Sequence, residues 1–198
     1  MYAYLRGKVI HMGTDSLILD VNGVGYQVFA NQVNLPDVHA RADSETALYI
    51  YTHFSAQQGA MALFGFSTLA EKDMFERLIQ ISGVGPKAAM SILSRLKPDE
   101  LAAAVFSENL TAFKGIPGVG QKTVQRIILE LRGKITMNEY GVDPKIVPAK
   151  RKNVDEAIQA LIGLGYSSKE ATKAVTSLEN IDEPVDKLIK LALMNMKV

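Results

Sequence analysis

Hydrophobic and polar residues alternate over much of residues 1–66, and this alternation predicts β-strands. The Asn22-Gly23 pair between two such runs is a strong signal for a two-residue hairpin turn. The strands are expected at residues 2–11, 16–21, 24–30, 47–54 and 60–66. Five short strands in about 65 residues are typical of a small barrel of the OB type, so we expect residues 1–66 to form one β-barrel domain.

From residue 67 the spacing of apolar residues changes to three and four, which is the spacing of helices. Ser67 or Thr68 can cap the first helix, and Glu71 places an acid in its first turn. Helices are expected at residues 70–79, 87–96, 99–106, 108–113 and 121–134. The pattern therefore predicts a central all-α domain over residues 67–140.

A repeated stretch organises this helical part. Residues 81–93 align with residues 116–128, and the alignment places one Gly-Val-Gly over the other and Lys87 over Lys122. Two glycines let the backbone adopt positive φ and approach a ligand closely, and the valine between them can pack the flanking helices together. The helix that follows each turn offers free N–H groups and a positive dipole end.

Each of the two lysines lies on that first helical turn, where its ammonium can reach the same phosphate. The pattern thus predicts two sites for the nucleic-acid backbone, with no readout of base edges. Arg126 shares a helix face with Lys122, where it either supports the phosphate contact or is solvated. The candidate DNA-binding residues are Gly83, Val84, Gly85, Lys87, Gly118, Val119, Gly120, Lys122 and Arg126.

The glycines allow three other interpretations. Residues 83–88 fit the dinucleotide fingerprint G-x-G-x-x-A, but a helical pattern precedes them where that motif needs a buried strand. Residues 115–123 nearly spell a P-loop, but Gln121 separates the last glycine from Lys122. The glycines could also serve packing alone, at a plain helix-turn-helix corner. Two copies with lysines at equivalent places favour phosphate binding over this third interpretation.

These residues resemble a tandem helix-hairpin-helix DNA-binding motif. With its flanking segments, the chain resembles the RuvA family, the Holliday-junction-binding subunits of bacterial branch-migration complexes, essentially end to end. The phrases that carry the resemblance are Leu5-Arg6-Gly7, Gly23-Val24-Gly25-Tyr26, Thr52-His53-Phe54, Phe64-Gly65-Phe66, Gly83-Val84-Gly85-Pro86-Lys87 and Leu164-Gly165-Tyr166.

The resemblance implies that the chain binds four-way junction DNA in an open form and recruits the RuvB motor ATPase for branch migration in recombination and repair. It implies a homotetramer, or two tetramers that sandwich a junction, with the RuvC resolvase as a further candidate partner. Family members usually carry an acidic pair in the loop at residues 55–59, which faces the junction centre. Gln58 and Gly59 stand at the matching positions here, so this junction-centre loop lacks the acidic pin.

Residues 141–152 contain Gly141, two prolines and the cluster Lys150-Arg151-Lys152, with few large apolar residues, as expected for a flexible linker. Residues 153–198 predict a UBA-like three-helix bundle, interrupted at Gly165-Tyr166. A core this small is expected to leave some apolar residues exposed for a partner, and the resemblance implies that this partner is RuvB. The motor-binding candidates are Leu164, Gly165, Tyr166, Leu188 and Leu191. The alternative for each of them is a place in the core of the bundle.

The net charge of the chain is only +1, but the charges are unevenly distributed. Residues 65–140 carry ten basic and eight acidic side chains, and residues 141–152 carry four and one. Residues 1–64 carry three and five, and residues 153–198 carry five and seven. The positive charge is therefore concentrated around the glycine motifs, as expected for a nucleic-acid-binding surface.

Catalytic and metal-binding patterns are weak in this sequence. There is no cysteine, and the three histidines lack metal-type spacing, so neither a metal nor another cofactor is expected. No long apolar run and no signal pattern occurs, so we expect a cytoplasmic protein without membrane contact. The favoured function is a non-catalytic DNA-binding subunit. There are two alternatives. The first is a helix-hairpin-helix repair enzyme, which would be a glycosylase or nuclease with an added catalytic Asp or Lys. The second is a nucleotide-binding protein.

Overall fold

The computed structural model describes residues 1–31, 45–55, 60–146, 149–178, 181 and 183–196. The chain packs into two units. One comprises Met1–Leu101 and Leu110–Ile127, and the other comprises Ala102–Asn109 and Ile128–Val198. The helical part predicted at residues 67–140 is therefore shared between the two units.

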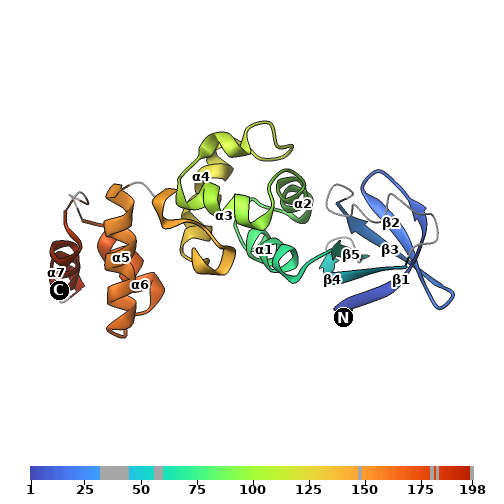
Figure 1. The fold of residues 1–198 in the computed structure, drawn as a ribbon, viewed down its shortest axis with the longest axis horizontal. Helices are drawn as coiled ribbons and strands as arrows, with labels where there is room; N and C mark the ends of the chain where they lie inside the picture. Colours follow the sequence, from blue (N-terminus) through green and yellow to red (C-terminus); the bar gives the residue numbers. More distant parts are fainter. Residues whose placement is uncertain (32–44, 56–59, 147–148, 179–180, 182, 197–198) are drawn as a thin grey trace. The chain divides into compact units, whose positions relative to one another are not determined.

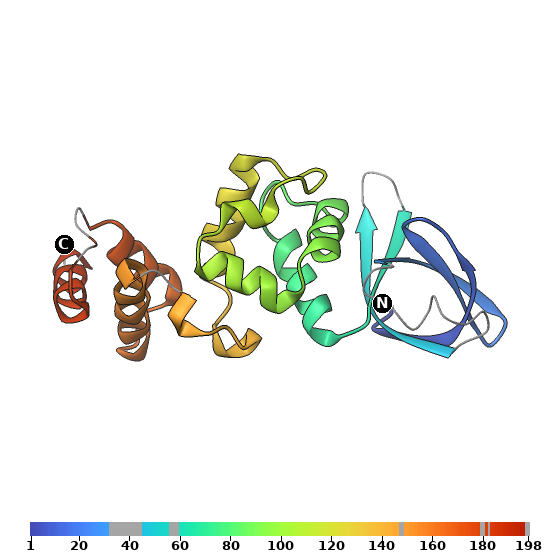
Figure 2. The same cartoon turned by 45° about the horizontal axis from the view of Figure 1, so that its top comes forward.

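The first five elements close into a barrel, and alternate residues of their strands face its interior (Figures 1 and 2). Its strands are β1 (Tyr4–Met12), β2 (Ser16–Val21), β3 (Val24–Ala30), β4 (Glu45–Ser55) and β5 (Ala60–Phe66). The order around the barrel is β1-β2-β3-β5-β4, with β3 and β5 parallel and the other pairs antiparallel. Leucine, isoleucine and valine side chains fill the interior, among them Leu17, Leu19, Val28, Leu48 and Ile50. The predicted barrel is confirmed.

The turn between β2 and β3 has the geometry that the sequence predicts. Asn22 and Gly23 both have positive φ, 53° and 84°, as a type I′ hairpin turn requires. The carboxylate of Asp20 accepts the Gly23 N–H at 2.7 Å and supports the turn. This turn fixes the strand register, which places Val21 opposite Val24.

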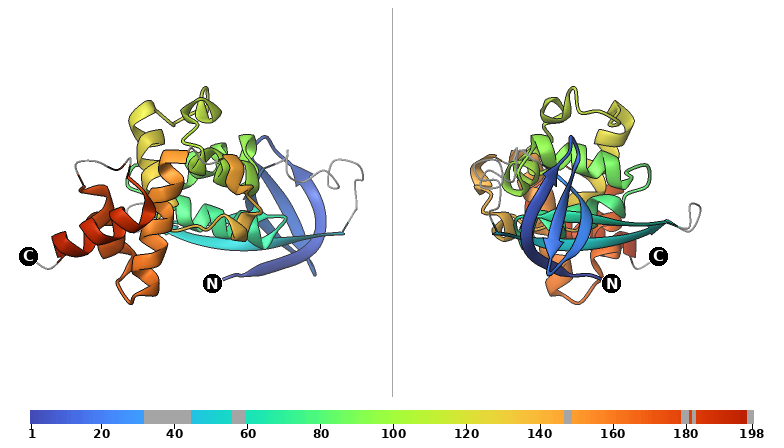
Figure 3. Two further views of the ribbon diagram at one scale, coloured as in Figure 1. Left: turned by 60° about the vertical axis from the view of Figure 1, so that its left-hand side comes forward. Right: turned by 90° about the vertical axis from the view of Figure 1, so that its right-hand side faces the viewer.

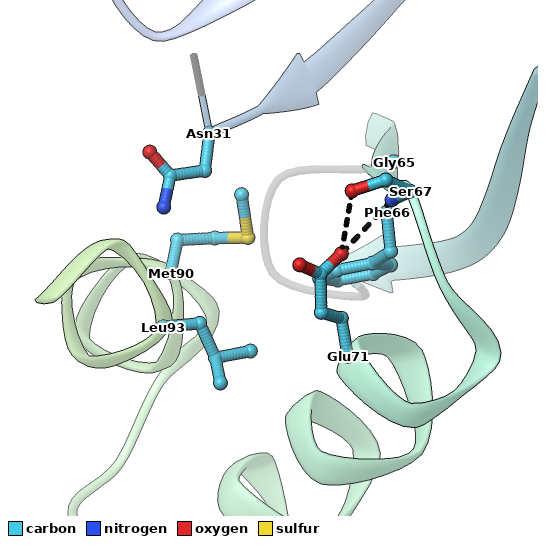
Figure 4. A pocket seen from close by; sticks show the side chains of 7 residues that line it. All are labelled: Asn31, Gly65, Phe66, Ser67, Glu71, Met90 and Leu93. Carbon is cyan, nitrogen blue, oxygen red and sulfur yellow. Dashed lines mark hydrogen bonds between the residues drawn. The ribbon is translucent and has the colours of Figure 1, made fainter. Parts of the chain in front are cut away.

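A capping box fixes the step from the barrel into α1 (Leu69–Ile79). The hydroxyl of Thr68 accepts the Glu71 N–H at 3.1 Å, while the Glu71 carboxylate accepts the N–H and the hydroxyl of Ser67 at 2.9 Å each (Figure 4). Glu71 is only 8% exposed, so these hydrogen bonds offset the cost of burying its charge. The Phe75 ring of α1 then packs 4.9–5.4 Å from aromatic rings of β4 and β5, those of Tyr51, Phe64 and Phe66.

Three of the other predicted central helices are present within two residues of their expected bounds: α2 (Pro86–Arg95), α3 (Pro98–Phe106) and α4 (Gln121–Arg132). The prediction of a helix at residues 108–113 is wrong about the residue at which the helix begins and about the type of helix. Glu108 has a left-handed φ of 54°, and the N–H of Asn109 bonds back to the Ala104 carbonyl at 2.9 Å, which terminates α3. Only a short 3₁₀ helix follows, η2 (Leu110–Phe113).

The C-terminal helices α5 (Ala149–Gly163), α6 (Ser168–Thr176) and α7 (Val185–Met196) pack together around a small core, as predicted. The segment before them differs from the expected linker. It contains the short 3₁₀ helices η3 (Asn138–Tyr140) and η4 (Pro144–Ile146), and α5 begins at Ala149. Residues 149–152, expected to belong to the flexible linker, are therefore part of a helix. Within the described residues, no helix is long and apolar enough to cross a membrane.

Candidate nucleic-acid interface

The two Gly-Val-Gly stretches form the same tight turn. Gly83 and Gly118 are the third residues of these turns, with φ of 88° and 77°. In each turn, the N–H of the following valine donates to the carbonyl of the isoleucine two residues before the glycine, at 3.0 Å in the first copy and 3.3 Å in the second. A positive φ at this position defines a type II turn and favours glycine, because L side chains are strained there.

Each turn leads directly into a helix whose first N–H groups lack a side-chain cap. Gly85 is the N-cap of α2, and Gly120 immediately precedes α4. Glycine has no side chain that can accept a first-turn N–H. Neither helix has an acid in its first turn, a feature shared only with α5 among the described α-helices, whereas α1, α3, α6 and α7 each have at least one. These two helix starts therefore keep an uncompensated positive end, which favours an anion.

The candidate lysines lie at these helix starts. Lys87 and Lys122 are each the second residue of their helix, and both side chains are exposed. Neither forms an ion pair with the residues that the structure describes. Val84 is buried and Val119 is half-buried, as expected if the valines join the helices. Each turn thus combines backbone donors and a cation at one place.

The two turns are also joined to each other. A Cβ added at Gly118 would lie 3.9 Å from the Cβ of Ala88 in α2. Arg126 of α4 reaches back to the first turn, where its Nη1 donates to the carbonyl oxygen of Ser82 at 2.9 Å. Arg126 is exposed, and its guanidinium has further N–H groups beyond this bond. Arg126 is therefore not simply solvated, because this hydrogen bond links α4 to the turn ahead of α2. The bond does not use its other N–H groups, so it does not prevent a contact with phosphate.

Gln58 and Gly59 of the junction-centre loop lie outside the described residues. The strands that carry this loop run side by side and pair as far as Ser55 and Ala60 (Figure 3). Phe54 and Met61 face each other near the end of this pair, and both are exposed. Sequence reasoning missed this exposed apolar pair, because strand alternation places both residues on the inward face and does not show where the barrel ends.

The structure separates the motor-binding candidates into three groups by exposure. Leu164 and Gly165 are exposed, and Tyr166 and Leu191 are half-buried. Leu188 is fully buried in the core of the bundle, so its side chain cannot contact a partner while the bundle is folded. The sequence analysis also missed Met194, an exposed residue of α7, because it continues the apolar pattern of the helix.

The described residues hold no group of three or more His, Asp or Glu side chains that could bind a metal ion. The candidate interface consists of backbone N–H groups at the two helix starts with Lys87, Lys122 and Arg126.

The fold and the site together define a class of protein: a five-stranded barrel followed by paired helix-hairpin-helix motifs and a helical C-terminal domain. Residues 1–65 match the family model "RuvA N terminal domain", residues 75–134 match "SAM-like Helix-hairpin-helix tandem", and residues 152–197 match "RuvA, C-terminal domain". The chain belongs to the RuvA family.

Full-length relatives agree with these matches. The chain is 37% identical over 193 residues to the Holliday junction branch migration complex subunit RuvA of Alkaliphilus oremlandii, which covers 98% of this chain and 97% of that protein. It is 40% identical over 196 residues to the protein of the same name from Syntrophobacter fumaroxidans, with 98% of each chain covered. The resemblance inferred from the sequence motifs is confirmed.

Proposed function

We propose that the chain is the non-catalytic, junction-binding subunit of a branch migration complex, which binds four-way DNA through its sugar–phosphate backbone. The observation that carries this proposal is the pair of equivalent helix starts, each with a glycine turn, an unpaired lysine and no acid. Such a site recognises phosphate and cannot distinguish base edges. The names of the relatives support the same activity.

The test is binding to a labelled four-way junction and to duplexes of unrelated sequence. Lys87→Ala and Lys122→Ala should each weaken junction binding to a similar extent across sequences and reduce the slope of log K against log salt by about 1. Lys169→Ala, which changes an exposed lysine of α6, is the control and should leave both quantities unchanged. A loss that depends strongly on DNA sequence would contradict backbone recognition.

The same labelled junction separates a binding subunit from a helix-hairpin-helix repair enzyme. Retardation of the intact junction supports the proposal, while strand cleavage or base loss would overturn it in favour of a nuclease or glycosylase.

We further propose that the C-terminal bundle contacts the RuvB motor through exposed apolar residues, among them Leu164 and Met194. Both are large apolar side chains that the small core of this domain leaves exposed. Leu164→Ser should weaken RuvB binding without affecting junction binding. Equal RuvB affinities for the parent and variant chains would exclude this contact.

We also propose a homotetramer, or two tetramers on one junction, which matches four protomers to four DNA arms. Light scattering with and without junction DNA measures the mass directly, and a monomeric mass in both conditions would contradict this assembly.

A further inference from the structure

The strands β4 and β5 continue past the rest of the barrel as a two-stranded ribbon (Figure 3). Strand β1 pairs with β4 only as far as Tyr49, and the chain ahead of β1 extends this contact to the hydroxyl of Thr52. On the other side, β3 pairs with β5 only from Leu63 onward. Residues 53–55 and 60–62, which we call the ribbon end, therefore pair with each other and with no further strand that the structure describes.

The two faces of this ribbon have different surroundings. One face is covered by α1, whose Phe75 ring lies 5.4 Å from the Tyr51 ring and 5.2 Å from the Phe64 ring. The other face continues the inward side of the barrel, but the interior has ended where Phe54 and Met61 pair, so these side chains are 67% and 56% exposed. Two large apolar side chains thus lie opposite each other on a ribbon that α1 supports from behind.

The support by α1 also fixes the ribbon relative to the first glycine turn. Helix α1 ends at Ile79, and Ile81 begins the turn, where its N–H donates to the Leu78 carbonyl at 3.0 Å. The ribbon, α1 and both glycine turns belong to the same compact unit. The ribbon end therefore keeps a fixed place in the part of the molecule that carries the proposed phosphate sites.

The ribbon has no charge suited to a phosphate contact. Residues 46–70 contain no acid, no lysine and no arginine, so this segment neither repels DNA nor attracts its backbone. The ribbon end presents instead a flat aromatic ring and a flexible thioether. Aromatic rings stack on bases of any sequence, and Phe and Met are among the side chains that proteins insert between base steps as wedges.

We propose that Phe54 and Met61 form an apolar wedge, which contacts DNA bases at a branch point. In a continuous duplex every base is stacked on its neighbours, and opening a base step costs free energy. At a branch point the stack is already interrupted, so base faces are accessible. The wedge therefore favours branched DNA over duplex, a preference that phosphate recognition by the glycine turns cannot provide. This inference rests on the proposed function, because it requires that the chain binds branched DNA.

The test uses the full-length protein and a four-way junction with 2-aminopurine, a base analogue whose fluorescence rises when it unstacks, at the branch point. The parent should raise this fluorescence there but not when the analogue lies in the middle of an arm. Phe54→Ala should reduce the rise and weaken junction binding by about fivefold or more, while duplex binding stays within about twofold of the parent. Met61→Ala should act in the same direction, and Phe54→Trp, which keeps a stacking ring, should bind and unstack like the parent.

Salt dependence separates the wedge from the lysines. Phe54→Ala removes no charge, so its slope of log K against log salt should equal that of the parent, whereas Lys87→Ala should reduce the slope. Ile10→Ala is the matched control, because Ile10 is an apolar residue of β1 with a similar exposed fraction, 59%. This control should bind and unstack junctions like the parent. Thermal melts check that each variant is folded.

Light scattering decides whether another copy of the chain covers the apolar pair instead of DNA. A lower mass for Phe54→Ala than for the parent would overturn the wedge and make the pair a subunit contact. Folded Phe54→Ala with the junction affinity and fluorescence of the parent would also overturn the wedge, while the proposed function would stand. Failure of the parent to bind the junction would refute the proposed function, and the wedge with it.

Discussion

The four glycines of the turns have two different roles that substitution can separate. Gly83 and Gly118 have positive φ, so alanine there is strained by about 1 kcal/mol or more. Gly85 and Gly120 lie outside the left-handed region, and a Cβ at either meets no atom within 4 Å. The first pair is needed to form the turn. We expect the second pair to be needed for the approach of a phosphate.

Gly85→Ala and Gly120→Ala should therefore lower the melting temperature less than the other two substitutions, because alanine at a helix N-cap costs little beside a strained φ, but they should still weaken junction binding. Gly83→Ala and Gly118→Ala should lower the melting temperature as well as the affinity. Thermal melts and junction titrations on the same four proteins decide this. If Gly85→Ala and Gly120→Ala bind like the parent, the DNA backbone does not approach these glycines closely.

Arg126 extends this argument to the contact between the two motifs. Its bond to the Ser82 carbonyl links α4 to the first turn. Arg126→Lys keeps a cation but loses the planar fork that can serve the carbonyl and a phosphate at once. We expect Arg126→Lys to weaken junction binding. Its slope of log K against log salt should differ less from the parent's slope than the slope of Lys122→Ala does. A slope reduced as much as in Lys122→Ala would show that its charge alone matters.

At the scale of single elements, the clearest pH-dependent contact is the capping box of α6. The hydroxyl of Ser167 donates to the Glu170 carboxylate at 2.6 Å, and the Ser167 N–H donates to the same oxygen at 3.0 Å. The hydrogen bond from the Ser167 hydroxyl has the larger effect and the one from the N–H the smaller, and together they hold the pKa of Glu170 below its usual value. A lowered pKa favours the folded state above the pKa of the unfolded chain, and this contribution is lost as the pH falls through the folded value.

Ser167→Ala should accordingly raise the pKa of Glu170 and destabilise the bundle at neutral pH more than in acid. Carbon-detected NMR titration of the Glu170 carboxyl, with melts at neutral and acidic pH, measures both effects. An unchanged Glu170 pKa in this variant would show that the cap is not formed in solution.

Most elements could be predicted because local chemistry determines them. Asn22-Gly23 sets the hairpin, Thr68 with Glu71 starts α1, and the glycine repeat gives two equivalent turns. The failures lie where a contact distant in sequence decides. Glu108 carries no turn signal, and only the folded chain shows it beside Arg132, 24 residues away. The burial of Leu188 and the exposure of Met194 likewise follow from packing, since both fit the same helical pattern.

At the scale of the whole molecule, the boundary of the DNA-binding part is a prediction that truncation can test. The segment 141–152 was expected as a linker, but Val142 within it is buried, as is Tyr140 just before it. A chain ending after Asp143 keeps both glycine turns and these two side chains. It should still bind four-way junctions and fail to stimulate the motor, as gel retardation and branch-migration assays would show. A chain that folds but no longer binds junctions would show that the C-terminal bundle contributes to DNA binding.

The junction-centre loop concerns the assembly as a whole, because its charge would be repeated in every subunit. Two unit charges at about 8–10 Å repel by roughly 1.5–2 kcal/mol at an effective dielectric near 20. Gln58→Glu with Gly59→Asp should therefore weaken junction affinity modestly and change the rate of branch migration. The neutral control is Gln58→Asn with Gly59→Asn. Equal affinities of both double variants over a range of salt would show that charge in this loop has no effect.

The pairing of the barrel strands also bears on how the chain folds. β1 joins β4, and β3 joins β5 in parallel, so the contacts that close the barrel link residues about 35 to 45 positions apart. The helices α5–α7 instead form their backbone hydrogen bonds between residues four positions apart. Contacts of long sequence separation slow folding, because the loop-closure entropy is lost before the contacts stabilise the structure. In refolding experiments the helical signal should therefore recover before the barrel closes, leaving unpaired strand edges open to aggregation during that interval.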